Sequence, residues 1–361
     1  MRLPRAVRLT IFIVVVIALI AGIVFGVRAL LGLKNEVGAP ERAKAEAGET
    51  ILRFNEGYLA TDGLTIRCFG SNNRAEPKWT PYSADSRERT VVASSSLIVM
   101  YRDDNLHVIS KEGSVKFNGV LSGMIELVRC GNNNVAVYLP SEQVVRVMSQ
   151  TGELVDNIST EGVELIDMGF FGEDLLWVSF LKKDAYTPST LLKTYQPNKR
   201  EMGGHSFDDQ LVYDVLYSNN TLYVVGTRDV SIINLTTNEV SSKKPLVYGW
   251  QLIDSAQIGT KDAGLLFTLA GESASGAPGR LKFIQGDGTE REIHLPAGCI
   301  GAFIGTKSIY GIAPDRVYSI TFSGVMTEYA LKEKIDKAVI LLEGNRLMVE
   351  MENEMRTMDL P

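Results

Sequence analysis

The chain has 361 residues, of which 45% are hydrophobic and 22% are charged, with a formal net charge of −6. These proportions are those of a globular protein and exclude a disordered or fibrous one. The basic residues before position 35 have no acidic counterpart, so the rest of the chain is more acidic than the total suggests. Such a body argues against nucleic acid as a partner, because polyanion binding needs clustered Lys and Arg. With only Cys68, Cys130 and Cys299, a disulfide framework is also excluded.

The first feature in chain order is an uncharged run, Leu9–Val27, between Arg8 and Arg28. As a helix it would be about 28 Å long, close to the thickness of a bilayer core. We therefore expect a short basic cytoplasmic tail (1–8), one transmembrane helix (9–33) that contacts membrane lipid, and an extracytoplasmic body. A cleaved signal peptide is the alternative, but the run is long and no A-x-A site follows it. Small residues every four positions could support a weak dimer of this helix: Ala18, Gly22 and Gly26.

Residues 34–50 form a polar segment that we expect to be a linker, with a short helix in its Ala/Glu/Lys section. From Ile51 to the C-terminus, one unit recurs. Its clearest copy, Ile125–Ser159, contains four short runs rich in Val, Ile and Leu, separated by turn residues. The last turn of each copy returns about every 42 residues, which is the period of a propeller blade.

The repeats predict an all-β fold over residues 51–361: a β-propeller of seven or eight blades, with eight favoured, preceded by the transmembrane helix. The last copy lacks an outer strand. We expect Ile51–Phe54 to supply that strand and close the ring by pairing near Met351–Met358.

The repeats resemble the pyrroloquinoline-quinone-like and WD40-like propeller superfamily. The segment Gly57–Gly70, GYLATDGLTIRCFG, with Trp79, is similar to the first blade of a membrane-anchored propeller family of Gram-positive bacteria known only as a domain of unknown function. The resemblance implies one N-terminal span and a propeller. It implies no reaction and no functional residues, and the Gly-x-x-x-Trp pattern of quinoproteins is mostly missing, so no cofactor is expected.

Acidic residues recur in the innermost run of successive repeats, with Arg129 at the aligned position in one copy. They are Glu126, Glu164, Asp167, Asp214 and Asp254. Innermost strands line the channel of a propeller, so these side chains could form an acidic ring that binds a cation or a basic group. The alternative is that they accept hydrogen bonds from neighbouring backbone at blade junctions.

Two repeats carry insertions between their second and third runs, Lys182–Ser189 and Gly271–Gly279, which we expect to be loops on one face of the propeller. The candidate binding residues there are Tyr186, Ser273 and Ser275. No catalytic or metal-binding motif stands out. The sequence therefore predicts a membrane-tethered extracytoplasmic scaffold or sensor that binds a protein or another component of the cell envelope. The alternative is an enzyme, a hydrolase or a quinoprotein, with its site at the channel mouth.

Overall fold

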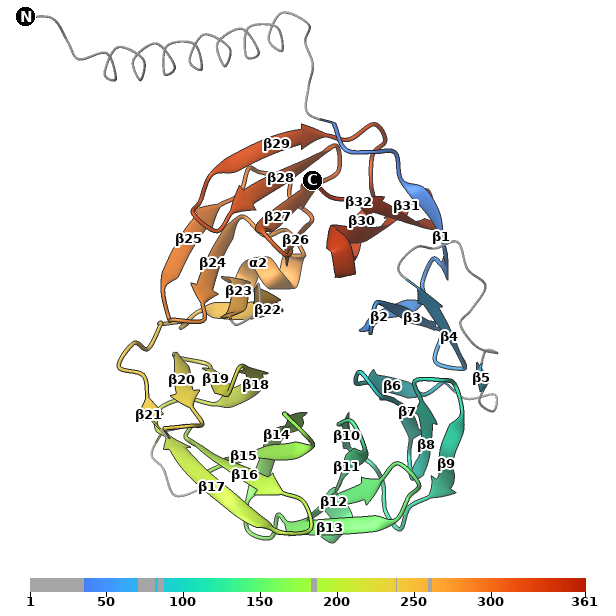
Figure 1. Cartoon of the computed structure of the whole chain (residues 1–361), viewed down its shortest axis with the longest axis vertical. Coiled ribbons are helices and arrows are strands. Elements are labelled where there is room, and N and C mark those ends of the chain that lie inside the picture. Colours follow the sequence, from blue (N-terminus) through green and yellow to red (C-terminus); the bar gives the residue numbers. More distant parts are fainter. Residues whose placement is uncertain (1–35, 71–81, 84–87, 183–186, 238, 259–261) are drawn as a thin grey trace, which may run out of the picture.

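The computed structural model describes residues 36–361 except 71–81, 84–87, 183–186, 238 and 259–261. The described strands form eight four-stranded antiparallel sheets that surround a central axis as the blades of a propeller (Figure 1). The all-β propeller and the favoured count of eight blades are therefore confirmed. The predicted span Leu9–Val27, with Ala18, Gly22 and Gly26, lies outside the described residues. Within them, no helix is long and apolar enough to cross a membrane.

Each blade is read from its innermost to its outermost strand. The first four blades are β2 (Thr50–Phe54), β3 (Gly57–Thr61), β4 (Thr65–Gly70) and β5 (Tyr82–Ser83); β6 (Thr90–Ala93), β7 (Leu97–Arg102), β8 (Asn105–Ser110) and β9 (Val115–Val120); β10 (Leu127–Cys130), β11 (Asn134–Leu139), β12 (Val144–Ser149) and β13 (Leu154–Ser159); and β14 (Glu164–Phe171), β15 (Leu175–Leu181), β16 (Thr190–Gln196) and β17 (Arg200–Phe207).

Blades 5 to 8 are β18 (Val212–Ser218), β19 (Thr221–Gly226), β20 (Val230–Asn234) and β21 (Glu239–Val240); β22 (Trp250–Ile258), β23 (Asp262–Leu269), β24 (Arg280–Gln285) and β25 (Glu290–His294); β26 (Gly301–Ile304), β27 (Ser308–Ala313), β28 (Arg316–Thr321) and β29 (Met326–Ala330); and β30 (Lys337–Leu342), β31 (Arg346–Met351), β32 (Glu354–Asp359) and β1 (Glu41–Glu46).

The core of the protein lies between blades rather than within one layer. The second strand of a blade has neighbouring blades against both of its faces, so it is apolar at consecutive positions. Strand β27, for example, is buried along its whole length. Outer strands lie at the rim, and seven of the eight residues of β17 are exposed. Burial of this apolar surface between adjacent sheets is what holds the ring together.

Ring closure differs from the sequence-based expectation. The outer strand of the last blade is β1, whose Glu41 and Arg42 lie opposite Thr357 and Arg356 of β32. Strand β2, which contains Ile51–Phe54, is instead the innermost strand of blade 1. The expected pairing of Ile51–Phe54 with the last blade is therefore wrong, although an N-terminal strand does close the ring.

The predicted linker 34–50 and its helix are corrected by the same observation. In β1, Ala43 and Ala45 are buried while the residues beside them are exposed, which is the two-residue alternation of a strand. Val37 is also buried, in the cluster that joins blades 7 and 8. The propeller domain therefore begins before position 40 rather than at Ile51.

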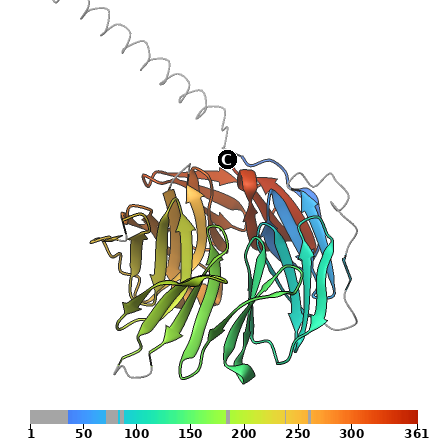
Figure 2. The ribbon, with the colours of Figure 1, turned by 60° about the horizontal axis from the view of Figure 1, so that its bottom comes forward.

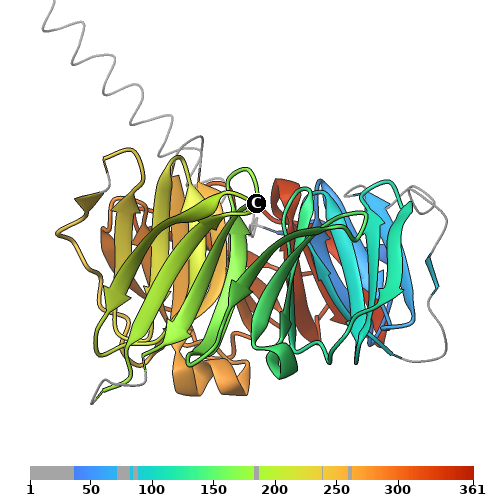
Figure 3. The ribbon, with the colours of Figure 1, turned by 90° about the horizontal axis from the view of Figure 1, so that it is seen from below.

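Strand direction fixes which connections share a face. Because strands alternate, the links from second to third strand leave from the same face as the links from one blade to the next. We call this the insertion face; it carries η1 (Pro140–Glu142), the connector 241–249, and α2 (Ala270–Ser275). Figure 3 shows α2 in orange and η1 in green projecting from this face, and Figure 2 gives an oblique view of the ring. The opposite face carries the turns between first and second and between third and fourth strands.

Candidate functional site: the central channel

Three neighbouring blades repeat one irregularity in their innermost strand. The register between first and second strands shifts just before Asp167 in β14, Asp214 in β18 and Asp254 in β22. Such β-bulges bend a strand and redirect the side chains beside them. In each case one carboxylate oxygen accepts the backbone N–H of the following residue, at 2.7 to 2.9 Å. The bulges thus give the three aspartates equivalent positions on blades 4, 5 and 6.

An arginine neutralises the first of these carboxylates. Nη2 of Arg129, on the inner strand of blade 3, lies 2.9 and 3.1 Å from the two oxygens of Asp167. Both side chains are only partly exposed, at 35% and 22%. This pair joins blades 3 and 4 at the channel wall, and both of its members line the cavity described below.

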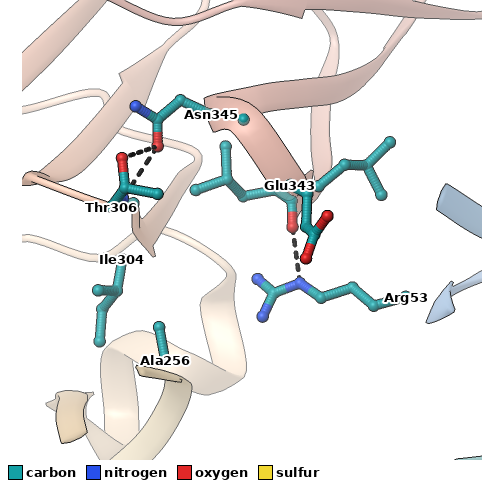
Figure 4. A pocket seen from close by; sticks show the side chains of 10 residues that line it. Arg53, Ala256, Ile304, Thr306, Glu343 and Asn345 are labelled. Atoms are coloured by element: carbon teal, nitrogen blue, oxygen red, sulfur yellow. Dashed lines mark hydrogen bonds between the residues drawn. The ribbon is translucent and has the colours of Figure 1, made fainter. Parts of the chain in front are cut away.

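A second arginine reaches the last carboxylate from the other side of the ring. Arg53 of β2 donates through Nε to the carbonyl of Leu341 at 2.6 Å, and its Nη2 lies 3.2 Å from Oδ1 of Asp254. Oδ2 of Asp254 also accepts the N–H of Ile304, at 2.9 Å. Blades 1, 6, 7 and 8 therefore meet around one guanidinium. Figure 4 shows Arg53 pointing into a small pocket of about 260 Å³ that Ile304 also lines.

Asp214, between the other two aspartates, has no arginine of its own. Its Oδ1 accepts the N–H of Val215, and among the described residues the other oxygen makes no protein hydrogen bond. It lines a cavity of about 520 Å³ between blades 3 and 6, together with Arg129 and Asp167. Apolar and aromatic residues also line it, among them Phe170, Trp177, Tyr213, Val215 and Leu252, but polar atoms, including those of Gln251, make up more of the lining than apolar atoms do.

Burial raises the pKa of all three carboxyls above the ordinary aspartate value. For Asp167 and Asp254 the neighbouring guanidinium opposes this effect. For Asp214 the Val215 N–H lowers the pKa, the negative charge of Asp167 raises it, and Arg129 opposes more weakly. Asp214 is thus the carboxylate whose charge the fold compensates least.

The predicted acidic residues therefore form an arc rather than a complete ring. Asp167, Asp214 and Asp254 occupy equivalent positions on adjacent inner strands, and Arg129 and Arg53 pair with the first and the last of them. Glu126 and Glu164 are exposed and lie three residues before Arg129 and Asp167, toward the insertion face. The alternative interpretation, in which the acidic side chains accept backbone hydrogen bonds at blade junctions, holds for Asp254, which accepts the N–H of Ile304.

The two insertions connect second to third strands, as expected. Tyr186 lies outside the described residues, and so does the side chain of Ser275. Ser273 is half-buried in α2, so the second insertion is a short helix where a loop was expected. Glu272 holds that helix in place by accepting the N–H groups of Gly279 and Arg280, each at 2.9 Å.

Sequence reasoning missed two groups at the channel. Arg53 had no predicted role, because Ile51–Phe54 was expected to be an outer strand and the structure places it innermost in blade 1. Trp177 had no predicted role either; it reaches the cavity because Gly169, opposite it in the sheet, has no side chain. A Cβ at Gly169 would lie 2.7 Å from the indole nitrogen.

The chemistry available in the channel is recognition by charge and apolar contact. Burial raises the pKa of the Cys130 thiol, which also lines the cavity, to about 12, so the thiol is protonated at neutral pH and is a poor nucleophile. Within the described ranges, no group of three or more His, Cys, Asp or Glu side chains is placed to hold a metal ion.

No family model and no curated protein matches the chain. Solved structures do resemble it. BamB from Moraxella catarrhalis is 11% identical, with a TM-score of 0.57 over 90% of this chain and 97% of that one. Sqt1 from Saccharomyces cerevisiae is 9% identical, with a TM-score of 0.55 over 91% and 100%.

The WD40 domain of SCAP from fission yeast is 9% identical, with a TM-score of 0.54 over 89% and 97% of the two chains. At these identities the likeness is one of fold. It confirms the resemblance to WD40-like propellers, whereas the narrower membrane-anchored family stays a prediction.

Proposed function

We propose that the protein is a membrane-tethered, extracytoplasmic propeller that acts by binding rather than by catalysis, as a scaffold or sensor for a protein at the cell envelope. The observation that carries this proposal is an exposed apolar pair on the insertion face, Leu246 and Tyr248, which are 59% and 82% exposed. Aromatic side chains are enriched among the residues that dominate protein interfaces.

The backbone of the connector 241–249 holds this pair outward. Pro245 and Val247 are buried, and they bond to blade 5 through Val230 N–H to Pro245 O at 3.0 Å and Val247 N–H to Arg228 O at 2.7 Å. Nζ of Lys282 donates to the carbonyl of Leu246 at 2.9 Å. Leu246 and Tyr248 are therefore presented on an ordered segment, which lowers the entropy lost on binding.

Helix α2 adjoins the same segment. The N–H of Ala270 donates to the carbonyl of Gly249 at 3.0 Å, so the second insertion begins where the connector ends. The apolar pair and the insertion thus form one surface over blades 5 and 6. Binding surfaces of repeat proteins gather on one face in this way, because the same loop of each repeat points in the same direction.

The proposed tether would hold this surface near a membrane. Val37 is already packed into the propeller, so only residues 34–36 separate the proposed helix (9–33) from the folded body. Fully extended, that stretch reaches about 10 Å. A partner within this reach would be a membrane protein or a component of the adjacent envelope.

Site-specific photocrosslinking in cells tests the proposal. A photoreactive amino acid at position 248 should give a discrete crosslinked protein species, and Leu246→Ser should reduce its yield. Position 154 is the matched control, because Leu154 is equally apolar, 59% exposed, and follows a turn of the opposite face. Equal crosslinking from positions 154 and 248, or none from 248, would count against a partner at the insertion face.

A further inference from the structure

We propose that the channel cavity between blades 3 and 6 is a binding site for a small organic cation: a primary ammonium on an apolar body that carries one hydrogen-bond acceptor. The inference rests on the cavity itself and does not depend on the membrane tether or on a protein partner.

The net negative charge of the cavity wall indicates that the ligand is a cation. Its walls carry one guanidinium, Arg129, and two carboxylates, Asp167 and Asp214. Arg129 is engaged by both oxygens of Asp167, which leaves the negative charge of Asp214 without an ionic partner. A buried carboxylate of this kind is stabilised by a cation that donates hydrogen bonds to it. A ligand with one positive charge would make the cavity and its ligand electrically neutral together.

The indole of Trp177 adds a hydrogen-bond donor to the wall. Trp177 is only 4% exposed, and among the described residues its indole N–H makes no hydrogen bond, so it can donate to an acceptor in the cavity. Buried polar groups in native proteins are normally paired, and a ligand that carries an acceptor would pair this one.

The remaining walls favour an organic ion over a metal. Phe170, Trp177 and Tyr213 bring aromatic rings to the cavity, and Val215 and Leu252 add a smaller apolar contribution. Aromatic faces attract ammonium groups, whereas a metal ion needs several oxygen, nitrogen or sulfur ligands. A volume of about 520 Å³ is that of a small-molecule site.

Two exposed carboxylates lie on the same inner strands as the cavity residues, toward the insertion face. Glu126 and Glu164 are exposed three residues nearer the insertion face on the strands that bear Arg129 and Asp167. Negative charge around the entrance of a channel raises the local concentration of cations and the rate at which they enter. The Arg53 and Asp254 pair lies at the opposite end of the arc and does not line this cavity.

The test is calorimetric titration of the full chain, purified in mild detergent, with three named probes. Tyramine has the ammonium, the apolar ring and an acceptor hydroxyl. Tyrosol replaces the ammonium with a neutral hydroxyl, and phenethylamine lacks the phenol oxygen. We expect tyramine to bind with a stoichiometry of one, phenethylamine to bind several-fold more weakly, and tyrosol to be weaker by about 10-fold or more.

Variants assign the binding to the cavity. Asp214→Asn should weaken tyramine by about 10-fold or more, and Trp177→Phe should weaken tyramine but not phenethylamine. Asp208→Asn is the control, since that carboxylate is 73% exposed on the insertion face. Melting temperatures show that each variant is folded, and the comparison of tyramine with tyrosol needs no variant.

Equal binding of tyramine and tyrosol, or unchanged tyramine binding in Asp214→Asn, would overturn the proposal. So would saturable binding of Ca²⁺ alone that is lost in Asp214→Asn while tyramine gives no heat. Failure of the crosslinking experiment at position 248 would leave this proposal intact, because the two sites share no residues.

Discussion

Arg53 of the first blade and Asp254 of the sixth meet at 3.2 Å, although two other blades separate them around the ring. The aspartate side chain is 8% exposed and the arginine side chain 40%. The contact ties the beginning of the propeller to its far side, and it leaves the carboxylate dependent on one distant cation.

Replacing Arg53 with Met should destabilise the protein by about 2 kcal/mol, because Asp254 would remain buried without its ionic partner. Arg53→Met/Asp254→Asn should recover part of this loss, and chemical unfolding of the four proteins of the cycle measures the coupling. The control is Arg42→Met, whose side chain is 77% exposed in its pair with Glu354 and should change stability by less than about 0.5 kcal/mol. Additive effects in the cycle would contradict the coupling.

Asp214→Asn should stabilise the protein at neutral pH. Burial raises the folded-state pKa of Asp214 above 3.8, so the native state binds this proton more tightly than the unfolded chain does. Stability is therefore lost as the pH rises from about 3.8 through the raised folded value, and the full penalty is present above it.

In thermal unfolding, the variant should melt roughly 2 °C or more above the parent at pH 7, with the difference shrinking as the pH falls toward 4. A difference that is constant with pH would show that the carboxylate is not the cause. Stabilisation by Asp214→Asn would also agree with a binding site in which the wild-type aspartate lowers the stability of the protein.

Asp174→Asn should weaken the junction of blades 3 and 4. The Asp174 carboxylate, in a turn of blade 4, accepts the backbone N–H groups of Asn132 and Asn133, at 2.5 and 2.9 Å, and the side-chain amide of Asn133 at 2.8 Å. Loss of these charge-assisted bonds should cost about 2 kcal/mol, measured by chemical unfolding.

The matched control for that variant is Asp209→Asn. Both aspartates have positive φ, 58° and 59°, so asparagine suits the backbone at either position. The Asp209 side chain is 55% exposed, and its replacement should change stability little. Similar losses of stability in the two variants would show that the hydrogen bonds of Asp174 across the junction do not cause the effect.

The closure of the ring can be tested by crosslinking. Cysteines at positions 42 and 356 are directly opposite in β1 and β32, and they should form a disulfide under mild oxidation, detected by non-reducing electrophoresis. Cysteines at positions 52 and 356 correspond to the pairing that the sequence suggested, and they should not crosslink. A crosslink between positions 52 and 356 but none between positions 42 and 356 would show that Ile51–Phe54 pairs with the last blade.

Much of this fold can be predicted from local sequence, because every blade except the last consists of four strands that are consecutive in the chain. The third repeat shows it: the four runs expected within Ile125–Ser159 are the four strands β10 to β13. The strand at Glu41–Glu46 was missed because Ala, Glu and Lys favour helices, and a partner at the other end of the chain overrides that preference. Its alternation of small and charged residues was the signal available.

The site was harder to predict than the fold. The acidic positions were visible as a repeated feature, but their bulges and cations were not. A bulge depends on how two strands pair, and Arg53 and Asp254 are 201 positions apart in the chain. Whether the charge of an aspartate is compensated is decided by such distant contacts, so sequence could propose a ring but could not single out Asp214.

Strand β1 has a consequence for how the protein is made. It leaves the ribosome before any blade exists, and its partner β32 is among the last segments to be synthesised. Throughout translation, the buried alanines of β1 have no sheet to join, and the growing arc of blades has two open ends. Closure is therefore a late event that requires the two extremities to find each other after synthesis. If the N-terminal segment is held in a membrane as proposed, that search would take place close to the bilayer surface, over a much smaller volume than in free solution.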